Sequence, residues 1–173
     1  MIQSDWKRIC GLSLQSDGVL AGVWIALDKL TDTCHLYDTI TLNREVPAVI
    51  VECIAARGKW IPVSWSASAK ELIGELLERG INTITEPIKE DESTLEMAAV
   101  NIEERMRSSR FKVDKRLKPW LEEFRSFRRT DAKIPREGYP LMMSTQYAMA
   151  RLSWAKRQSV VRGQKNYPRV NTL

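Results

Sequence analysis

The first 42 residues alternate between hydrophobic and polar positions in a way that predicts three β-strands. Segments 6–14 and 35–42 alternate, whereas segment 19–27 is apolar almost throughout. A near-continuous apolar run is typical of a strand that is buried on both faces. Turn residues separate the three segments, with Gly18 in the first turn and Asp32 in the second. The pattern therefore predicts an antiparallel three-strand meander.

Beyond residue 45 the apolar positions follow the helical period of 3.6, interrupted by short extended segments. We expect helices over 46–57, 68–79, 117–127 and 141–152, and a further helix that begins at residue 93. Short strands are expected over 60–65, 81–85 and 111–113. The tetrapeptides 68–71 and 93–96 have the Ser-x-x-Glu form of a capping box, so Ser68 and Ser93 are the expected N-caps. This order of elements predicts an α/β domain with a mixed sheet.

The composition fits one globular domain without features of secretion or of the membrane. The chain has 173 residues, of which 43% are hydrophobic, enough for a single core. No apolar run approaches the roughly 18 residues of a transmembrane helix, and the N-terminus lacks a signal-peptide pattern. The three cysteines lie in apolar stretches and match no zinc pattern, so we expect reduced cysteines in a cytoplasmic protein. The expected domain covers 1–153, and 154–173 is expected to be a basic, flexible tail.

The charge suggests a polyanionic partner without proving one, because many basic proteins bind nothing anionic. The net charge is +5 and the sequence pI is about 9.2. Segment 154–173 contains basic residues and no acidic residue, and segment 105–136 is also rich in Arg and Lys. Such runs fit contact with DNA phosphates, although a solvated basic surface is the alternative. The residues expected to contact DNA are Arg125, Arg128, Arg129, Lys156, Arg157, Arg162, Lys165 and Arg169.

Four stretches resemble, in order, the nuclease domain of phage and prophage large terminases. They are 55–65 (Ala-Ala-Arg-Gly-Lys-Trp-Ile-Pro-Val-Ser-Trp), 105–113 (Arg-Met-Arg-Ser-Ser-Arg-Phe-Lys-Val), 120–129 (Trp-Leu-Glu-Glu-Phe-Arg-Ser-Phe-Arg-Arg) and 141–148 (Leu-Met-Met-Ser-Thr-Gln-Tyr-Ala). The second is similar to the family pattern Arg-Met-x-x-Gly-Arg-[Leu/Phe]-Lys-Val, with Ser109 in place of glycine. Each match is moderately specific, and together they cover about residues 6–152.

The resemblance implies an RNase H-like fold, with a central mixed sheet flanked by helices. In that fold the three-strand antiparallel meander is joined by parallel strands, which agrees with the order of elements predicted above. It also implies a nuclease that cuts concatemeric viral DNA with Mg²⁺ or Mn²⁺. The family holds these ions by carboxylates at the end of the first strand, the end of the fourth strand and the start of the last helix.

This sequence lacks a carboxylate at each of those three places. Ser13 stands at the end of the first strand, Ser68 after the fourth, and Tyr139 and Pro140 at the start of the last helix. Because Mg²⁺ and Mn²⁺ prefer charged oxygen ligands, hydroxyls and a proline cannot replace the missing carboxylates. The expectation is a vestigial site with no functional catalytic residue and no cofactor, with Mg²⁺ or Mn²⁺ needed if the chain is active after all.

Three functions therefore remain open. The first is an inactive nuclease-like domain that binds double-stranded DNA or a packaging partner. The second is an active metal-dependent endonuclease with relocated carboxylates, for which the candidates are Asp17, Asp91, Asp131 and Glu137, Asp17 and Asp131 being the weak candidates for metal ligands. The third is a regulatory protein that docks on the terminase small subunit, the terminase motor or the portal. No Walker A pattern occurs, so this chain lacks the ATPase motor, and we expect a phage or prophage protein in the host cytoplasm.

Overall fold

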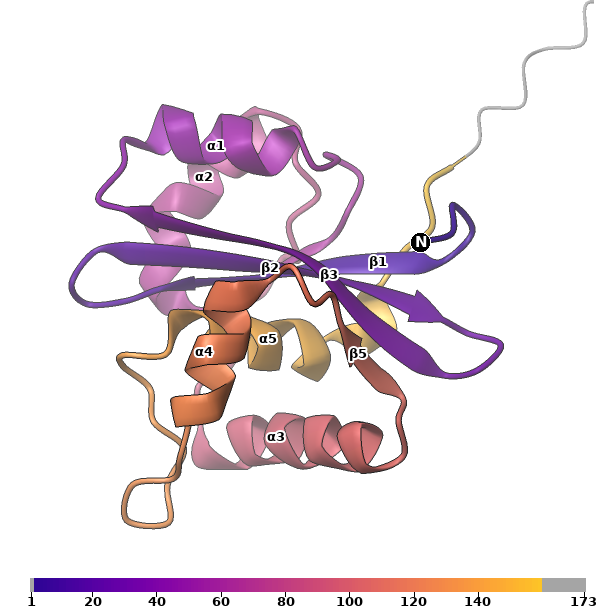
Figure 1. The fold of residues 1–173 in the computed structure, drawn as a ribbon. Helices are drawn as coiled ribbons and strands as arrows, with labels where there is room; N and C mark the ends of the chain where they lie inside the picture. The colour runs from indigo at the N-terminus through magenta and orange to yellow at the C-terminus, as the bar shows by residue number, and fades with distance from the viewer. Residues whose placement is uncertain (1, 160–173) are drawn as a thin grey trace, which may run out of the picture.

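The structure, a computed structural model, describes residues 2–159 and contains one five-stranded mixed sheet (Figure 1). Strands β1 (Lys7–Leu14), β2 (Val19–Asp28) and β3 (Thr33–Asn43) form an antiparallel meander. Strand β4 (Val63–Trp65) pairs in parallel with β1, and β5 (Phe111–Val113) pairs in parallel with β3. The order across the sheet is β4-β1-β2-β3-β5, which confirms the predicted mixed sheet.

Helices cover both faces of the sheet, in two layers that Figure 1 shows above and below the strands. Helices α1 (Pro47–Ala55) and α2 (Lys70–Glu78) lie on one face, and a 3-10 turn (Ala67–Ala69) leads into α2. On the other face lie α3 (Glu92–Arg107), α4 (Lys118–Ser126) and α5 (Pro140–Ala150), and a second 3-10 turn (Leu152–Trp154) follows α5. None of the helices that the structure describes is long and apolar enough to cross a membrane.

The alternation of side chains along the strands divides the apolar residues between two cores. In β1, Cys10 and Leu12 pack into the core under α1 and α2, whereas Ile9 packs into the core under α5. The central strand β2 serves both cores, with Trp24 on one side and Val23 on the other. This explains why its sequence is apolar almost throughout.

Helix α5 is enclosed, because the sheet covers one side of it and α3 and α4 cover the other. Every residue from Leu141 to Met149 is buried, including Ser144, Thr145 and Gln146. The sheet approaches α5 so closely that a β-carbon at Gly11 would lie 1.9 Å from the carbonyl oxygen of Ser144. The polar side chains of the interface bond to backbone, as the Ser64 hydroxyl does by donating to the carbonyl oxygen of Tyr147 over 2.8 Å.

Several local expectations were wrong. Segment 81–85 forms no strand, because Thr83 makes only a single parallel bridge to Val63; Ile81 is buried in the core under α1 and α2, and Ile84 in the core under α5. The fourth strand is shorter than 60–65, since its first residues form a turn closed by the Ile61 N–H on the carbonyl oxygen of Gly58. The N-cap of α3 is Asp91, whose carboxylate accepts from the backbone N–H of Thr94 over 2.7 Å, and not Ser93.

Packing continues past the expected domain end at residue 153. Ala155 is buried, and Lys156 exchanges two backbone hydrogen bonds with Arg8 at the start of β1, of 2.7 and 3.1 Å. The expected tail residues Arg162, Lys165 and Arg169 lie outside the described residues. All three cysteines are unpaired thiols, with Cys10 and Cys34 buried.

Candidate functional site

The topology brings together the ends of β1 and β4 and the start of α5. Strands β1 and β4 are parallel and pair Leu12 with Trp65, so Ser13, still within β1, and Ser66, directly after β4, lie side by side at this end of the sheet. The start of α5 lies against the same end, because the Ser13 hydroxyl donates to the carbonyl oxygen of Pro140 over 2.8 Å. Two of the expected vestigial positions, 127 residues apart in sequence, are therefore in direct contact.

Ser13 is part of the packing between β1 and α5. Its side chain is 1% exposed, and its hydroxyl oxygen lies 2.9 Å from that of Ser144, which also lies 2.9 Å from the carbonyl oxygens of Ala21 and Pro140. These hydroxyls and carbonyls satisfy one another. Ser13 is thus part of a closed hydrogen-bond cluster between β1, β2 and α5.

Ser68 lies in the 3-10 turn that contacts the end of β1. Its hydroxyl is 2.8 Å from that of Ser66, which is fully buried, whereas Ser68 itself is exposed. The expectation that Ser68 caps the following helix was wrong, because the N-cap residue of α2 is Ala69 and no side chain caps it. Because Ser68 lies inside the 3-10 turn, Ala69 stands between it and the first residue of α2.

Tyr139 and Pro140 begin α5 and carry structural roles. The Tyr139 hydroxyl donates to the carbonyl oxygen of Ser126 over 3.2 Å, and its ring meets Phe127 edge to face with centroids 5.1 Å apart. Pro140 is the first helical residue, where its missing N–H costs nothing. Neither side chain supplies a negatively charged oxygen for a cation.

The N-terminus of α5 is capped from outside by Glu123 of α4. One carboxylate oxygen of Glu123 accepts from the backbone N–H groups of Leu141 (2.9 Å) and Met142 (3.1 Å). Burial raises the pKa of this carboxyl group, and the two N–H bonds oppose that rise in part. Sequence reasoning missed this role, although Glu123 belongs to one of the four stretches that carry the resemblance.

The relocated-carboxylate candidates do not assemble into one group. Asp17 in the β1–β2 turn accepts from the N–H of Val19 over 3.0 Å, and Glu137 accepts from the N–H of Ser16 over 3.4 Å, so these two lie near the same end of β1. Asp131 lies exposed in the loop before α5 with a left-handed φ of 50°, and Asp91 is used as the cap of α3. Their places in the fold therefore favour local structural roles.

One carboxylate near the pocket was missed by sequence reasoning. Glu90 precedes α3 and contacts the hydroxyl of Tyr147, a buried residue of α5 on the side of Ser66. Burial and the neighbouring carboxylate raise the pKa of Tyr147. No local pattern could have revealed this contact, because it joins a loop to a helix 57 residues later.

The side chains at this end of the sheet do not fit a catalytic metal pair. Among residues 2–159, no three Asp, Glu, His or Cys side chains come together in a group that could hold a metal ion. The serine hydroxyls there lie in two pairs, Ser13 with Ser144 and Ser66 with Ser68, and all four are neutral. Mg²⁺ and Mn²⁺ need negative oxygen ligands to offset their lost hydration, and these hydroxyls do not supply them.

The residues expected to contact DNA fall into two groups. Arg125, Arg128 and Arg129 lie in α4 and the segment after it, and Arg129 is held by Glu96 through bonds of 2.5 and 2.7 Å. Lys156 and Arg157 lie beside the start of β1 and are exposed. The paired Arg129 is less available to a phosphate than Arg125, for which the described structure shows no ion pair.

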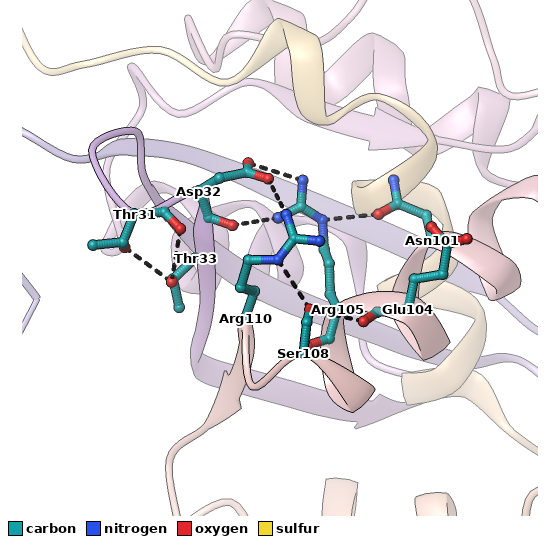
Figure 2. Close-up of polar contacts among 8 residues, drawn as sticks. All are labelled: Thr31, Asp32, Thr33, Asn101, Glu104, Arg105, Ser108 and Arg110. Atoms are coloured by element: carbon teal, nitrogen blue, oxygen red, sulfur yellow. Dashed lines mark hydrogen bonds and ion pairs between the residues drawn. The ribbon is translucent and has the colours of Figure 1, made fainter.

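The stretches that carry the resemblance connect elements of the fold. Arg105 and Arg110 both bind Asp32 in the β2–β3 turn, over 3.0 and 2.5 Å between guanidinium nitrogens and carboxylate oxygens (Figure 2). Arg105 also donates to the carbonyl oxygen of Asp32 over 2.5 Å. Trp120 donates from its indole nitrogen to the hydroxyl of Thr145 over 2.9 Å, which ties α4 to α5.

Solved nuclease domains share this arrangement over most of the chain. The P22 large terminase nuclease domain superposes with a TM-score of 0.80 at 17% identity, covering 91% of this chain and 87% of that domain. The chain has the fold of a large terminase nuclease domain. The large terminase nuclease from thermophilic phage G20c with bound cobalt gives 0.65 at 21% identity, covering 87% and 84%. The g2p large terminase nuclease domain from bacteriophage SPP1 with bound Mn gives 0.64 at 18% identity, covering 84% and 86%.

No protein-family model and no curated protein matches the sequence. At this level of identity the similarity shows the terminase-nuclease fold, whereas catalytic activity depends on the side chains that the chain carries. Those side chains differ in kind from the ligands that a bound divalent ion requires.

Proposed function

We propose that this chain is a phage DNA-packaging protein that keeps the terminase-nuclease fold, binds double-stranded DNA or a packaging partner, and does not cleave DNA. Its partners would be DNA together with the terminase small subunit, the terminase motor or the portal. It would act in the cytoplasm of the host cell. The proposal rests on the fold and on the chemistry of the pocket at the ends of β1 and β4.

The carrying observation is the closed contact between Ser13 and Pro140. In an active site of this fold that end of β1 would present charged oxygens to two ions. Here the hydroxyl of Ser13 is buried and donates to the backbone of α5 instead. A cation could reach this oxygen only if α5 moved away from the sheet.

The electrostatics support the same proposal. Two divalent ions stabilise the attacking and leaving oxygens of a phosphoryl displacement only if negative ligands hold them. Phosphate oxygens of bound DNA could supply part of that charge but not all of it. The basic side chains would then hold DNA without cutting it.

The second candidate is an active nuclease with relocated carboxylates. The observation in its favour is that Asp17 and Glu137 both lie near the end of β1. Both are engaged with local backbone N–H groups, and a third carboxylate does not join them among the described residues. The inactive protein is therefore the better supported proposal.

The proposal is tested by a gel-shift titration of the intact chain on linear duplex DNA with Mn²⁺ present. The expected result is a retarded band of unchanged DNA length, which weakens steeply as salt rises. Arg125→Glu should weaken the shift, whereas Glu71→Gln on the opposite helical layer should not. Shortened DNA would contradict the inactive nuclease, and the absence of any shift would leave a protein partner as the remaining ligand of the proposal.

A further inference from the structure

No helix of residues 2–159 covers one half of the sheet face on the α1 and α2 side. Figure 1 shows α1 and α2 over the half nearer the β1–β2 turn, while the half nearer the N-terminus has no helix above it. The strand register places Arg8 opposite Ala26, Ala26 opposite His35, and His35 opposite Lys112. Paired residues on neighbouring strands project to the same side. These side chains therefore form one row across this half of the face, in which Ala26 is fully buried, Arg8 and His35 are partly exposed and Lys112 is exposed.

The row has cations at both ends and a small residue in the middle. Lys156 extends it beyond Arg8 through the antiparallel bridge between the two. Neighbouring strands lie about 4.8 Å apart, so the row from Arg8 to Lys112 is about 14 Å long. Within the described part of the chain, no carboxylate pairs with Arg8, Lys112 or Lys156.

More unneutralised charge lies at the same end of the sheet. Lys7 begins β1 and contacts Lys29 of the β2–β3 turn, and Arg157 follows Lys156. The contact with Lys29 and the fields of Lys29 and Arg157 lower the pKa of Lys7. Asp28 acts on His35 through its field, and Asp114 is paired with Arg116, so carboxylates offset part of this charge. The cations remain in excess, and an anion that binds among them would reduce their mutual repulsion.

Aromatic rings lie beside the row. Trp6 stacks on His35 with ring centroids 4.4 Å apart, and the Arg8 guanidinium lies 5.6 Å from the Tyr37 ring and 5.5 Å from the Trp60 ring. Trp6, His35, Tyr37 and Trp60 are each partly exposed, although the Tyr37 hydroxyl is buried. A hollow of about 310 Å³ adjoins them, with His35, Tyr37 and Lys112 among the residues that line it.

Cations interleaved with open rings match the chemistry of a single nucleic-acid strand. The cations meet successive phosphates, and unpaired bases stack on aromatic side chains or on an arginine plane. In a duplex the faces of the bases are already stacked on one another, so the rings would gain nothing from it.

We propose that the row of Arg8, His35, Lys112 and Lys156, with the adjoining rings, binds single-stranded nucleic acid. This surface lies at the opposite end of β1 from Ser13, so it is separate from the vestigial pocket. The proposal rests on the proposed function in one respect, that the chain binds nucleic acid. It adds a second binding site and specifies a single strand as the ligand.

The test is fluorescence anisotropy of the intact chain with labelled oligo-dT and oligo-rU of about 15 nucleotides and with a hairpin duplex of similar length. Lys112→Glu should weaken oligo-dT binding about ten-fold and reduce the slope of log affinity against log salt by about 0.7, the value for one lost phosphate contact. Trp6→Leu should weaken it about five-fold or more through lost stacking. Lys118→Glu, an exposed charge reversal on α4, is the matched control and should change affinity less than about two-fold.

The two oligonucleotides distinguish DNA from RNA, and tighter binding of either over the duplex supports the proposal. Oligo-dT affinity unchanged in both Lys112→Glu and Trp6→Leu would overturn it, as would binding of the duplex alone. A chain that shifts duplex DNA but binds no single strand refutes this site and leaves the proposed function intact. Cleavage of DNA by a chain that still loses oligo-dT through Lys112→Glu refutes the inactive nuclease and leaves this site intact.

Discussion

Replacing Gly11 with alanine should break the contact on which the pocket depends. A β-carbon at this position would lie 1.9 Å from the carbonyl oxygen of Ser144 and 2.8 Å from the backbone nitrogen of Ala148. Relief to an ordinary contact of 3.4 Å requires 3.4 − 1.9 = 1.5 Å of movement between β1 and α5. Both partners are backbone, so no side-chain rotation can relieve the overlap.

Helix α5 has no free side toward which it could shift, because all its residues from Leu141 to Met149 are buried. Overpacking in a rigid core costs about 1–3 kcal/mol, and a backbone clash of this size belongs at the upper end. We therefore expect Gly11→Ala to lower the free energy of unfolding by about 3 kcal/mol. In a chain of this size that corresponds to a fall in Tm of about 6–12 °C.

Urea denaturation followed by circular dichroism measures this change, with the m-value checked for constancy. Gly74→Ala is the matched control, because Gly74 lies exposed inside α2 and a β-carbon there meets nothing within 4 Å. That variant should gain about 0.5–1 kcal/mol from helix propensity. A Gly11→Ala protein within about 1 kcal/mol of the parent would show that α5 does not rest on β1 as described.

Three further substitutions test other contacts. Ser109→Gly should raise the free energy of unfolding by about 0.5 kcal/mol, because Ser109 has a φ of 57° where the family pattern has glycine; Ser108→Gly, with a negative φ, should lower it in the same denaturation assay. Glu123→Gln should remove one source of pH dependence from the free energy of unfolding. Folding raises the pKa of Glu123 above its ordinary 4.5, so the stabilisation that comes from this shift is fully present below that pH and is lost as pH rises through the folded pKa. The stability of the parent relative to Glu123→Gln should therefore fall between pH 4 and pH 7, and a constant difference would contradict the burial argument. Asp32→Asn should cost about 1 kcal/mol by releasing Arg105, whose side chain is 12% exposed, and equal Tm values would show that the cluster in Figure 2 contributes nothing.

The sheet could be predicted because each long strand has a recognisable pattern of apolar and polar residues in its own sequence. The alternation in β1 and β3 and the apolar run in β2 reflect which faces are covered, and the structure confirms the meander. Segment 81–85 misled the prediction because Ile81 and Ile84 are apolar and β-branched, yet the segment makes a single bridge, between Thr83 and Val63, and the two isoleucines enter different cores. Composition therefore does not distinguish a strand from a buried loop in so short a segment.

The candidate site was predicted mainly from the resemblance to terminase nuclease domains, and less from the chemistry of its residues. Nothing local distinguishes Ser13 from an ordinary strand residue, and its partner Pro140 lies 127 residues away. The capping of α5 by Glu123 and the contact between Glu90 and Tyr147 were missed, because both depend on how distant helices pack. Local patterns specify elements, whereas the partners of buried polar groups are set by tertiary packing.

We propose that the residues at the end of β1 form no active nuclease site, and cleavage of supercoiled plasmid is the most direct measurement of this. The intact chain is incubated in molar excess over plasmid with Mn²⁺ and, separately, with Mg²⁺, beside a triple variant carrying Ser13→Asp, Ser68→Asp and Pro140→Asp. The parent chain should leave the plasmid supercoiled with either ion. Mn²⁺-dependent nicking by the parent chain, abolished by Asp17→Ala or Asp131→Ala, would instead show an active nuclease with relocated carboxylates.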